Sequence, residues 1–332
     1  MIDEIRAVAD ETDFSGVVVV SREGRRLAEL SRGFADRAHL RLNTLDTQFG
    51  TASATKGVTA LVVGSLVESG HLGLDTTLRS LLDDALPLVD PAVTIEHLLG
   101  HTSGVGDYLD EEELDDIDAH VLDVAAHRLA TPGDYVQLLD GRPGKSVPGD
   151  EFAYNNSGYV MLSLAIEAVS GMSFYDVVQE RVLDPAGMTD TGFFRSDELP
   201  TRAAIGYLGD GRSNVFHLPV RGAGDGGIYS TVADVERLWA ALFAGLILSI
   251  DMVETFVEPR MDVPAENRRY GWGFWLLPDR PTVMLEGMDA GVSFRSACDR
   301  PTGFGYTVIS NTSLGAWPIA RLLAERLPLL AD

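Results

Sequence analysis

Strand-forming segments lie near both ends of this chain, and helical patterns fill the region between them. Residues 16–21 read Gly-Val-Val-Val-Val-Ser, a β-branched run typical of a buried strand, and Glu23-Gly24 marks a hairpin turn into a second strand around residues 27–34. Four more short segments of strand character follow near the C-terminus, separated by Pro, Gly or Asp turns: residues 270–277, 282–286, 292–298 and 304–309. We therefore predict one antiparallel sheet assembled from both ends of the chain.

Helical spacing of apolar residues completes the fold prediction. The expected helices cover residues 2–10, 53–69, 94–99, 156–169, 174–182, 234–248 and 314–327, and residues 72–82 are expected to form a turn and a short helix. This pattern predicts an α/β fold of the α+β type, in which helices flank the sheet and a mostly helical part is inserted. We expect a single unit of 332 residues, with an α/β subdomain formed by residues 1–70 and 227–332 and a mostly helical subdomain formed by residues 71–226.

The segment Thr51-Ala52-Ser53-Ala54-Thr55-Lys56 is the first candidate for chemistry. It lies where a polar segment gives way to an apolar helical run, so Ser53 and Lys56 share one face of a helix, about one turn apart. A serine hydroxyl becomes a good nucleophile when a base takes its proton, and a lysine can be that base when burial lowers its pKa. A Ser-x-x-Lys pair alone is common, however, and a solvated lysine is its usual explanation.

Lysine usage in the whole chain favours the chemical interpretation. The 26 basic residues comprise two lysines, Lys56 and Lys145, and 24 arginines. A chain that otherwise uses arginine for positive charge keeps an amine beside Ser53. Arginine could not act as a base there, because its guanidinium does not lose a proton in proteins.

Net charge limits the classes of partner. The formal charge of −24 disfavours nucleic acid and anionic membrane surfaces, because their phosphates would be repelled. No apolar run approaches the roughly 18 residues of a membrane span. The N-terminal residues 1–6 have neither the basic start nor the apolar core of a secretory signal, so we expect a cytoplasmic protein that acts on a small molecule. The oligomeric state stays open.

Three other sequence features are explained without a catalytic or binding role. Eight of the twelve residues in 107–118 are acidic, which predicts a solvated face or a mobile loop; if it bordered the active site, it would disfavour anionic substrates. His97 and His101 are four residues apart, but Leu98 follows His97 and Gly100 interrupts the helix, so we expect no metal site. The glycine-rich segment 222–227 lacks the context of a phosphate loop and predicts a tight structural turn.

The sequence Tyr154-Asn155-Asn156, directly before a predicted helix, adds a second motif. Together with Ser-x-x-Lys, this Tyr-x-Asn resembles the serine β-lactamase and penicillin-binding-protein superfamily, and more closely its branch of class C β-lactamases, D-alanyl-D-alanine carboxypeptidases and esterases. Three further stretches resemble that branch and follow its order along the chain: residues 98–104 (Leu-Leu-Gly-His-Thr-Ser-Gly), residues 184–191 and residues 223–234.

The resemblance implies a mechanism without a metal or organic cofactor. Ser53 attacks a carbonyl and becomes an acyl-enzyme, Lys56 accepts its proton, and Tyr154 passes a proton to the leaving group. Asn156 holds Lys56 or the amide of the substrate. His101 is expected to be a structural cap of its turn rather than a base.

The third motif of the family is where this sequence departs from the pattern. The family has Lys-Thr-Gly or His-x-Gly on the strand beside the serine, and we align Asp289-Ala290-Gly291 with it, with Met288 as the rival start. The usual cation is then absent. Gly291 would still allow a close approach, so that a backbone N–H near Val292 joins that of Ser53 in an oxyanion hole. Arg295 could restore positive charge at this site, but on an alternating strand its side chain is expected to face away from the cleft.

These observations favour a serine hydrolase that acts as an esterase or amidase on small neutral substrates, because Asp289 would repel a substrate carboxylate. Two alternatives stay open. One is a β-lactamase or D-amino-acid peptidase with the same chemistry. The other is a non-catalytic binding or assembly module that keeps the fold.

Overall fold

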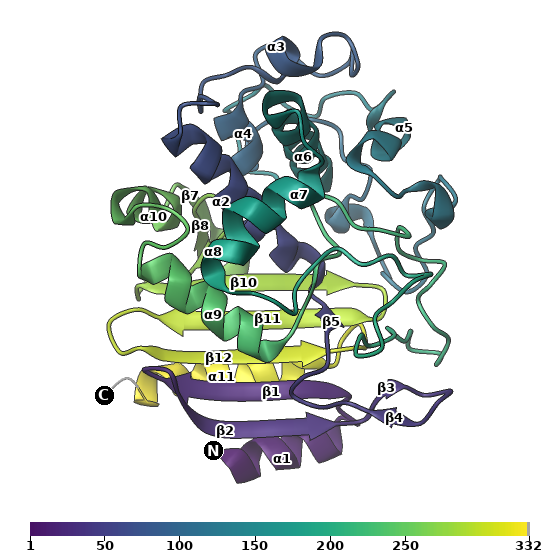
Figure 1. Ribbon diagram of the computed structural model, residues 1–332, viewed down its shortest axis with the longest axis vertical. Coiled ribbons are helices and arrows are strands. Elements are labelled where there is room, and N and C mark those ends of the chain that lie inside the picture. Colours follow the sequence, from purple (N-terminus) through teal and green to yellow (C-terminus); the bar gives the residue numbers. More distant parts are fainter. Residues whose placement is uncertain (331–332) are drawn as a thin grey trace.

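An eight-stranded antiparallel sheet forms the centre of the computed structural model, which describes residues 1–330 (Figure 1). Its order is β2-β1-β12-β11-β10-β9-β8-β7. The strands are β1 (Gly16–Arg22), β2 (Arg25–Arg32), β7 (Met261–Val263), β8 (Arg268–Tyr270), β9 (Trp275–Leu276), β10 (Thr282–Asp289), β11 (Val292–Asp299) and β12 (Phe304–Ser310). The N-terminal hairpin β1–β2 pairs with the C-terminal strand β12, which confirms the predicted sheet from both chain ends.

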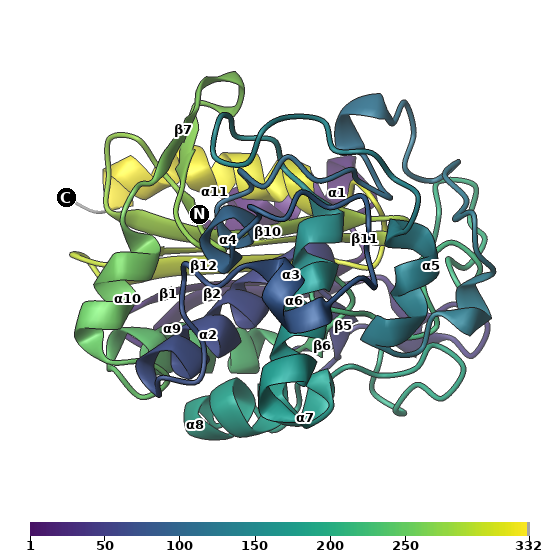
Figure 2. The same ribbon diagram turned by 90° about the horizontal axis from the view of Figure 1, so that it is seen from above.

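The valine run of β1 explains why the sheet separates two hydrophobic cores. Successive side chains of a strand point to opposite faces. Val17 and Val19 belong to the larger core, whereas Val18 and Val20 belong to a smaller one. Helices α1 (Ile2–Glu11) and α11 (Ala316–Leu330) cover the smaller core, and Figure 2 shows them on the face opposite to the other helices.

The remaining elements lie between β2 and β7 in the sequence. They are α2 (Thr55–Glu68), α3 (Leu78–Leu82), α4 (Ile95–Leu99), α5 (Val136–Leu139), α6 (Asn156–Ser170), α7 (Phe174–Val178), α8 (Asp184–Ala186), α9 (Val232–Phe243), α10 (Ile250–Val257), and the short strands β3 (Phe34–Asp36), β4 (Arg41–Leu42), β5 (Phe49–Gly50) and β6 (Tyr229–Ser230). A 3₁₀ turn, η1 (Ala52–Ala54), leads into α2. The exact division into two subdomains stays a prediction.

Helix α2 lies at the core of the molecule and carries Lys56. Its buried residues run from Thr55 to Leu66 on nearly all sides, as expected for a helix enclosed by others. Two glycines allow this enclosure: a Cβ at Gly57 would lie 2.4 Å from Leu285 Cδ2 of β10, and one at Gly64 would lie 2.9 Å from the Phe256 ring. The sheet therefore contacts the helix directly below its first turn.

One predicted strand is wrong in part. Within residues 270–277 only Tyr270, the last residue of β8, and the two residues of β9 lie in strands, because the chain turns between them at Gly271 and Gly273. Gly273 has φ +82°, a left-handed conformation that interrupts a strand. Among residues 1–330, no single helix is long and apolar enough to cross a membrane; α6 and residues Phe174–Ala186 meet those criteria only as a pair that is bent by 86°.

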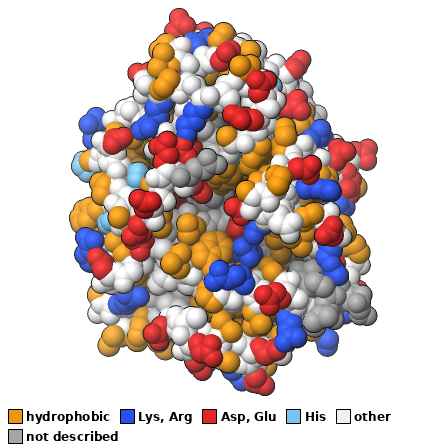
Figure 3. Space-filling model, turned by 180° about the vertical axis from the view of Figure 1, so that it is seen from behind, with side chains coloured by type: hydrophobic (Ala, Val, Ile, Leu, Met, Phe, Trp, Pro, Cys, Tyr) orange, Lys and Arg blue, Asp and Glu red, His pale blue; other side chains and the backbone are white. Residues whose placement is uncertain are grey.

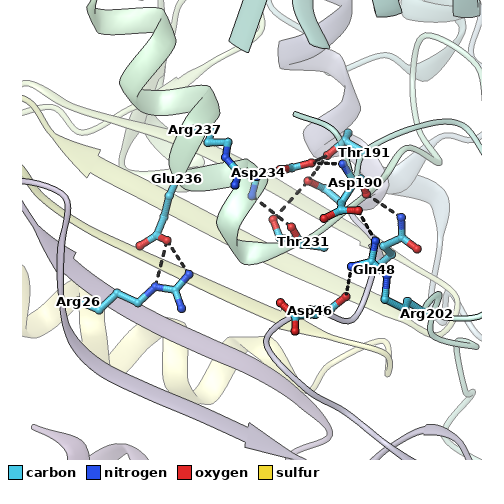
Figure 4. A network of polar contacts seen from close by, with 11 residues as sticks. Arg26, Asp46, Gln48, Asp190, Thr191, Arg202, Thr231, Asp234, Glu236 and Arg237 are labelled. Carbon is cyan, nitrogen blue, oxygen red and sulfur yellow. Dashed lines mark hydrogen bonds and ion pairs between the residues drawn. The ribbon is translucent and has the colours of Figure 1, made fainter. Parts of the chain in front are cut away.

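A network of hydrogen bonds and ion pairs connects residues 190 and 191 to helix α9 (Figure 4). Asp234, fully buried in the first turn of α9, accepts hydrogen bonds from Thr191 Oγ1 (2.7 Å) and from the Asp190 amide (2.8 Å), and it pairs with Arg237. Thr231 caps α9 by accepting from the Asp234 amide. This network uses residues from two of the family-like stretches, so those stretches have a structural role here.

Candidate active site

Ser53 lies on the strained turn that precedes α2. Ala52 has φ +47°, which is unusual for a residue with a side chain. The Thr55 hydroxyl supports this turn by donating to the Ala52 carbonyl (2.7 Å) and accepting from the Ile228 amide (3.1 Å). The Ser53 side chain, half-buried, opens into a cleft.

Lys56 is buried, with 1% of its surface exposed, and its amine donates to three oxygens that carry no formal charge. These are Ser53 Oγ (2.9 Å), Asn156 Oδ1 (2.7 Å) and the Asp225 carbonyl (2.8 Å). No carboxylate among the described residues lies within ion-pair distance of the amine. Burial lowers the pKa of Lys56, although the more distant carboxylates of Asp225 and Glu111 oppose this shift.

Tyr154 completes the group around Ser53. Its ring centroid lies 4.9 Å from Lys56 Nζ, and its hydroxyl interacts with the Ser53 side chain. The rings of His101 (4.4 Å between centroids) and Trp275 (6.0 Å) hold it in place. Burial, and next the negative charge of Glu111, raise the pKa of Tyr154 well above its usual value, so the group is a phenol at neutral pH.

Asn156 connects the buried lysine to the acidic segment. Its Oδ1 accepts from Lys56, and its Nδ2 donates to the Leu109 carbonyl (2.8 Å) and to Glu111 Oε1 (3.3 Å). Asp107, also from this segment, is buried and accepts from the amides of Asn156 (2.8 Å) and Ser157 at the start of α6. The prediction of a solvated face for 107–118 is therefore wrong at its beginning, because a carboxylate is a favourable partner for a helix N-terminus.

His101 is a neutral brace for the Tyr154 segment, in agreement with the predicted structural role. The Asn155 amide donates to His101 Nδ1 (3.1 Å), so the ring proton lies on Nε2 and points to the Tyr270 hydroxyl (3.2 Å). Burial and the neighbouring Lys56 charge lower the pKa of His101 well below its usual value. His97 has a different partner, the Thr94 amide, and the described residues contain no cluster of metal-binding side chains.

The close approach between strand and nucleophile occurs at Gly287, not at Gly291 as the alignment predicted. A Cβ on Gly287 would lie 2.6 Å from the Ser53 amide nitrogen. Gly291 instead sits in the β10–β11 turn (φ +73°), where its amide donates to Ser313 Oγ (2.7 Å). The third motif is therefore Leu285-Glu286-Gly287, four residues earlier, and the usual cation is absent there too.

The other predicted third-motif residues differ in their distance from the cleft. Asp289 lines the cleft together with Ser53, whereas Val292 lies outside its lining and faces Gly50 of β5. Arg295 lines the wider part of the cleft, so the expectation that it faces away from the cleft is wrong; it pairs with Glu286, which also binds Arg268 (2.9 Å). These paired charges lie at the other end of the cleft.

The cleft has two parts that meet at Ser53. One part encloses about 890 Å³ up to its mouth and is lined by Tyr108, Asn156, Asp225 and Asp289. The other is wider, about 1810 Å³, and contains Tyr154. Figure 3, which views the molecule from behind relative to Figure 1, shows a hollow near the middle of this face, with hydrophobic and charged side chains around the opening.

Asp225 and Tyr108 contribute to the site but were not predicted from the sequence. Asp225 provides the carbonyl that accepts from Lys56, and its side chain accepts from the Tyr108 hydroxyl (2.5 Å). The glycines around it did indicate the tight turn, which the structure confirms: a Cβ on Gly222 would lie 2.2 Å from the Gly226 carbonyl. The presence of an acidic residue inside this glycine-rich turn could have indicated that Asp225 belongs to the site.

Comparison with known proteins gives a consistent result. The chain is 31% identical to penicillin-binding protein 4* of Bacillus subtilis over 82% of its own length and 62% of that protein, and 30% identical to esterase EstB of Burkholderia gladioli over 93% and 88%. The chain thus spans less than two thirds of the first of these relatives. A penicillin-binding protein of Bacillus halodurans has the same fold, with a TM-score of 0.90, 36% identity and coverage of 97% and 99%.

The family model described as Beta-lactamase matches residues 2–324, nearly the whole chain. This match covers every element that builds the cleft. The chain belongs to the β-lactamase family.

Proposed function

We propose that this protein is a serine hydrolase that cleaves small esters and amides through an acyl-enzyme on Ser53. The observation that carries the proposal is the contact of 2.9 Å between Lys56 Nζ and Ser53 Oγ in a buried setting that lowers the pKa of the amine. An uncharged amine at this position can take the serine proton.

Acylation then proceeds in two steps. Ser53 Oγ bonds to the substrate carbonyl carbon while its proton passes to Lys56 Nζ, which leaves an oxyanion on the former carbonyl. When this intermediate collapses, the bond to the leaving oxygen or nitrogen breaks, and the leaving atom takes the Tyr154 phenol proton. Lys56 returns its extra proton to Tyr154.

Deacylation reverses these steps with water in place of the leaving group. Tyr154 passes its proton to Lys56, and water bonds to the acyl carbon while it gives a proton to Tyr154. The bond from this carbon to Ser53 Oγ then breaks, and Ser53 takes its proton back from Lys56.

The strand register supports an assignment of the oxyanion-binding amides. Asp289 and Val292 close the β10–β11 hairpin, and alternate residues of β10 bond to β11. This alternation turns the Met288 N–H toward the edge of β10 that lies beside Ser53, where β9 no longer pairs. We assign the oxyanion hole to the amides of Ser53 and Met288, in place of the amide near Val292.

Two observations favour an esterase or amidase over the alternative of a β-lactamase or D-amino-acid peptidase. Esterase EstB is among the relatives that match most of the chain. The third motif offers Leu285 and Glu286 where the family has its cation, which removes a partner for a substrate carboxylate. The predicted cytoplasmic location belongs to the same proposal, and cell fractionation would test it.

The test is acylation of the purified chain by p-nitrophenyl acetate, followed by intact-mass and peptide analysis. We expect one acetyl group on Ser53, none in Ser53→Ala, and normal labelling of Ser196→Ala, which removes another serine of the cleft. Failure of the wild type to become labelled by this ester or by a fluorophosphonate would support the non-catalytic alternative. Faster hydrolysis of a chromogenic cephalosporin than of p-nitrophenyl acetate would overturn the preference for esters.

A further inference from the structure

The position of Tyr154 assigns the two parts of the cleft to the two ends of a substrate. Tyr154, which gives its proton to the leaving group in the proposed mechanism, lines only the wider part. The leaving group therefore occupies the wider part, and the acyl group enters the narrower part on the other side of Ser53. We call this narrower part, lined by Tyr108, Asn156, Asp225 and Asp289 among others, the acyl-side pocket.

The titratable groups of the acyl-side pocket are mainly acidic, with two histidines, His120 and His217, beside them. Glu111, Asp225 and Asp289 line it, and no lysine or arginine is among its described lining residues. Lys56 acts on Asp289 from outside this lining, and burial disfavours its charged form. A carboxylate on an acyl group would meet three carboxylates here, whereas a cation would be attracted by all of them.

The three carboxylates differ in their partners within the protein. Asp225 accepts from the Tyr108 hydroxyl (2.5 Å), and Glu111 accepts from the Asn156 amide group (3.3 Å). Asp289 has no hydrogen-bond or ion-pair partner among the described residues. It is the last residue of β10 and lies two positions after Gly287, so its side chain points to the same face of the sheet, where Ser53 lies. An unpartnered carboxylate thus faces the pocket beside the nucleophile.

The remaining walls limit the size and polarity of the ligand. The pocket is also lined by the apolar side chains of Leu109, Ile117, Phe194, Val215 and Leu218. Such a pocket suits a compact group with aliphatic carbon around one charged nitrogen.

We propose that the acyl-side pocket selects acyl groups that carry a positively charged nitrogen, and that Asp289 pairs with this nitrogen. This inference rests on the proposed hydrolase function and replaces the expected neutral substrate with a cationic one. Asp225 and Glu111 add to the attraction. The leaving group is not restricted by this pocket.

The test compares two p-nitrophenyl esters of equal shape, those of trimethylammonioacetic acid and 3,3-dimethylbutanoic acid. Their acyl groups differ only in the quaternary nitrogen that replaces a carbon. Each kcat/KM is divided by the spontaneous hydrolysis rate of the same ester, which removes the intrinsic effect of the charge. We expect the cationic ester to be preferred by about tenfold or more, as is reasonable for a partly desolvated charge pair.

Variants locate the source of this preference. Asp289→Asn should bring the ratio of the two esters close to one, and Glu111→Gln should lower it by a smaller factor. Asp279→Asn is the matched control, because it removes the same charge from an exposed residue before the opposite end of β10 and should keep the preference. Thermal unfolding of each variant shows whether it is folded.

The outcomes separate this inference from the proposed function. If neither ester acylates Ser53, the hydrolase proposal itself fails. If the neutral ester reacts as well as the cationic one, or if the preference survives in Asp289→Asn, only the inference about the acyl group is wrong.

Discussion

Asp234 and Lys56 are both almost completely buried, and their surroundings are opposite. Asp234, 0% exposed, pairs with Arg237 and accepts from Thr191 and Asp190 (Figure 4). Lys56, 1% exposed, has only neutral oxygens within hydrogen-bonding distance. Asp234 therefore has donors that stabilise its charge, whereas Lys56 has a setting that favours loss of its charge.

The difference separates a structural group from a reactive one. A buried ion with good partners is costly to disturb and has little chemical freedom. A buried ion without a counter-ion has a shifted pKa and is available for proton transfer. Both groups come from family-like stretches of the sequence, so the motif alone does not distinguish them; their partners do.

The largest expected effect is on activity, in Lys56→Met. This variant keeps the length of the side chain and removes the base, so kcat/KM should fall by about 10³-fold or more. Because burial lowers the pKa of Lys56, the folded state binds the lysine proton less tightly than the unfolded state, which costs stability, and methionine removes that cost. We therefore expect little change in Tm. Lys145→Met, on the surface, is the matched control, and a large loss of Tm in Lys56→Met would contradict the comparison.

Asp234→Asn should show the opposite pattern. Loss of the carboxylate weakens its bonds to Thr191 and Arg237, and we expect about 2 to 3 kcal/mol less free energy of unfolding. The folded fraction should keep its kcat. Glu236→Gln, two residues away in a half-exposed pair with Arg26, is the control and should cost about 1 kcal/mol or less. Denaturant unfolding measures both, and equal losses would contradict the distinction.

Tyr154→Phe tests a second group on the reactive side of the comparison. It removes the proton donor and keeps the ring between His101 and Trp275, so kcat for an amide should fall by about 10²-fold. A p-nitrophenyl ester should be affected less, because its leaving group departs without a proton. Equal losses for both substrates would argue against proton donation by Tyr154.

The smallest effect is a pH dependence of substrate choice. Burial, then the charges of Asp225 and Glu111, raise the pKa of Asp289 to about 7, while Lys56 opposes the shift. Above this pH Asp289 is ionised, so the preference for the cationic ester should grow as pH rises through about 7 and decline below it. His120 and His217 also line the pocket, and Asp289→Asn controls for them: a pH response that persists in this variant would have another source.

Sequence alone predicted the sheet, the serine–lysine pair and the Tyr-x-Asn motif because each depends on local spacing or on residue type. The valine run of β1 indicated a strand buried on both faces, and the three-residue spacing placed Lys56 one turn from Ser53. The contact between Lys56 and Asn156, 100 residues apart, followed only from the family resemblance.

The third motif was misaligned for a geometric reason. Gly287 and Gly291 are four residues apart, and in an alternating strand both would lie on the same face. Their spacing cannot show which one meets Ser53. Only the packing of β10 against the Ser53 turn identifies Gly287.

Acidic residues were harder still to interpret from the sequence. Asp107 stands at the start of a strongly acidic run, which suggested solvent, yet it caps α6 and is buried. The average charge of a segment gives no information on whether a single side chain in it points inward. The same holds for Asp225, whose partners come from α2 and from Tyr108.

The most direct test of the central claim is the titration of the Lys56 amine itself. Because the chain has two lysines, labelling with [¹³C,¹⁵N]lysine gives two side-chain signals, and Lys145→Arg leaves only that of Lys56. We predict that the Lys56 signal titrates below the ordinary lysine value of 10.5. A midpoint at or above that value would show a permanently charged amine at neutral pH and would contradict its role as the base for Ser53.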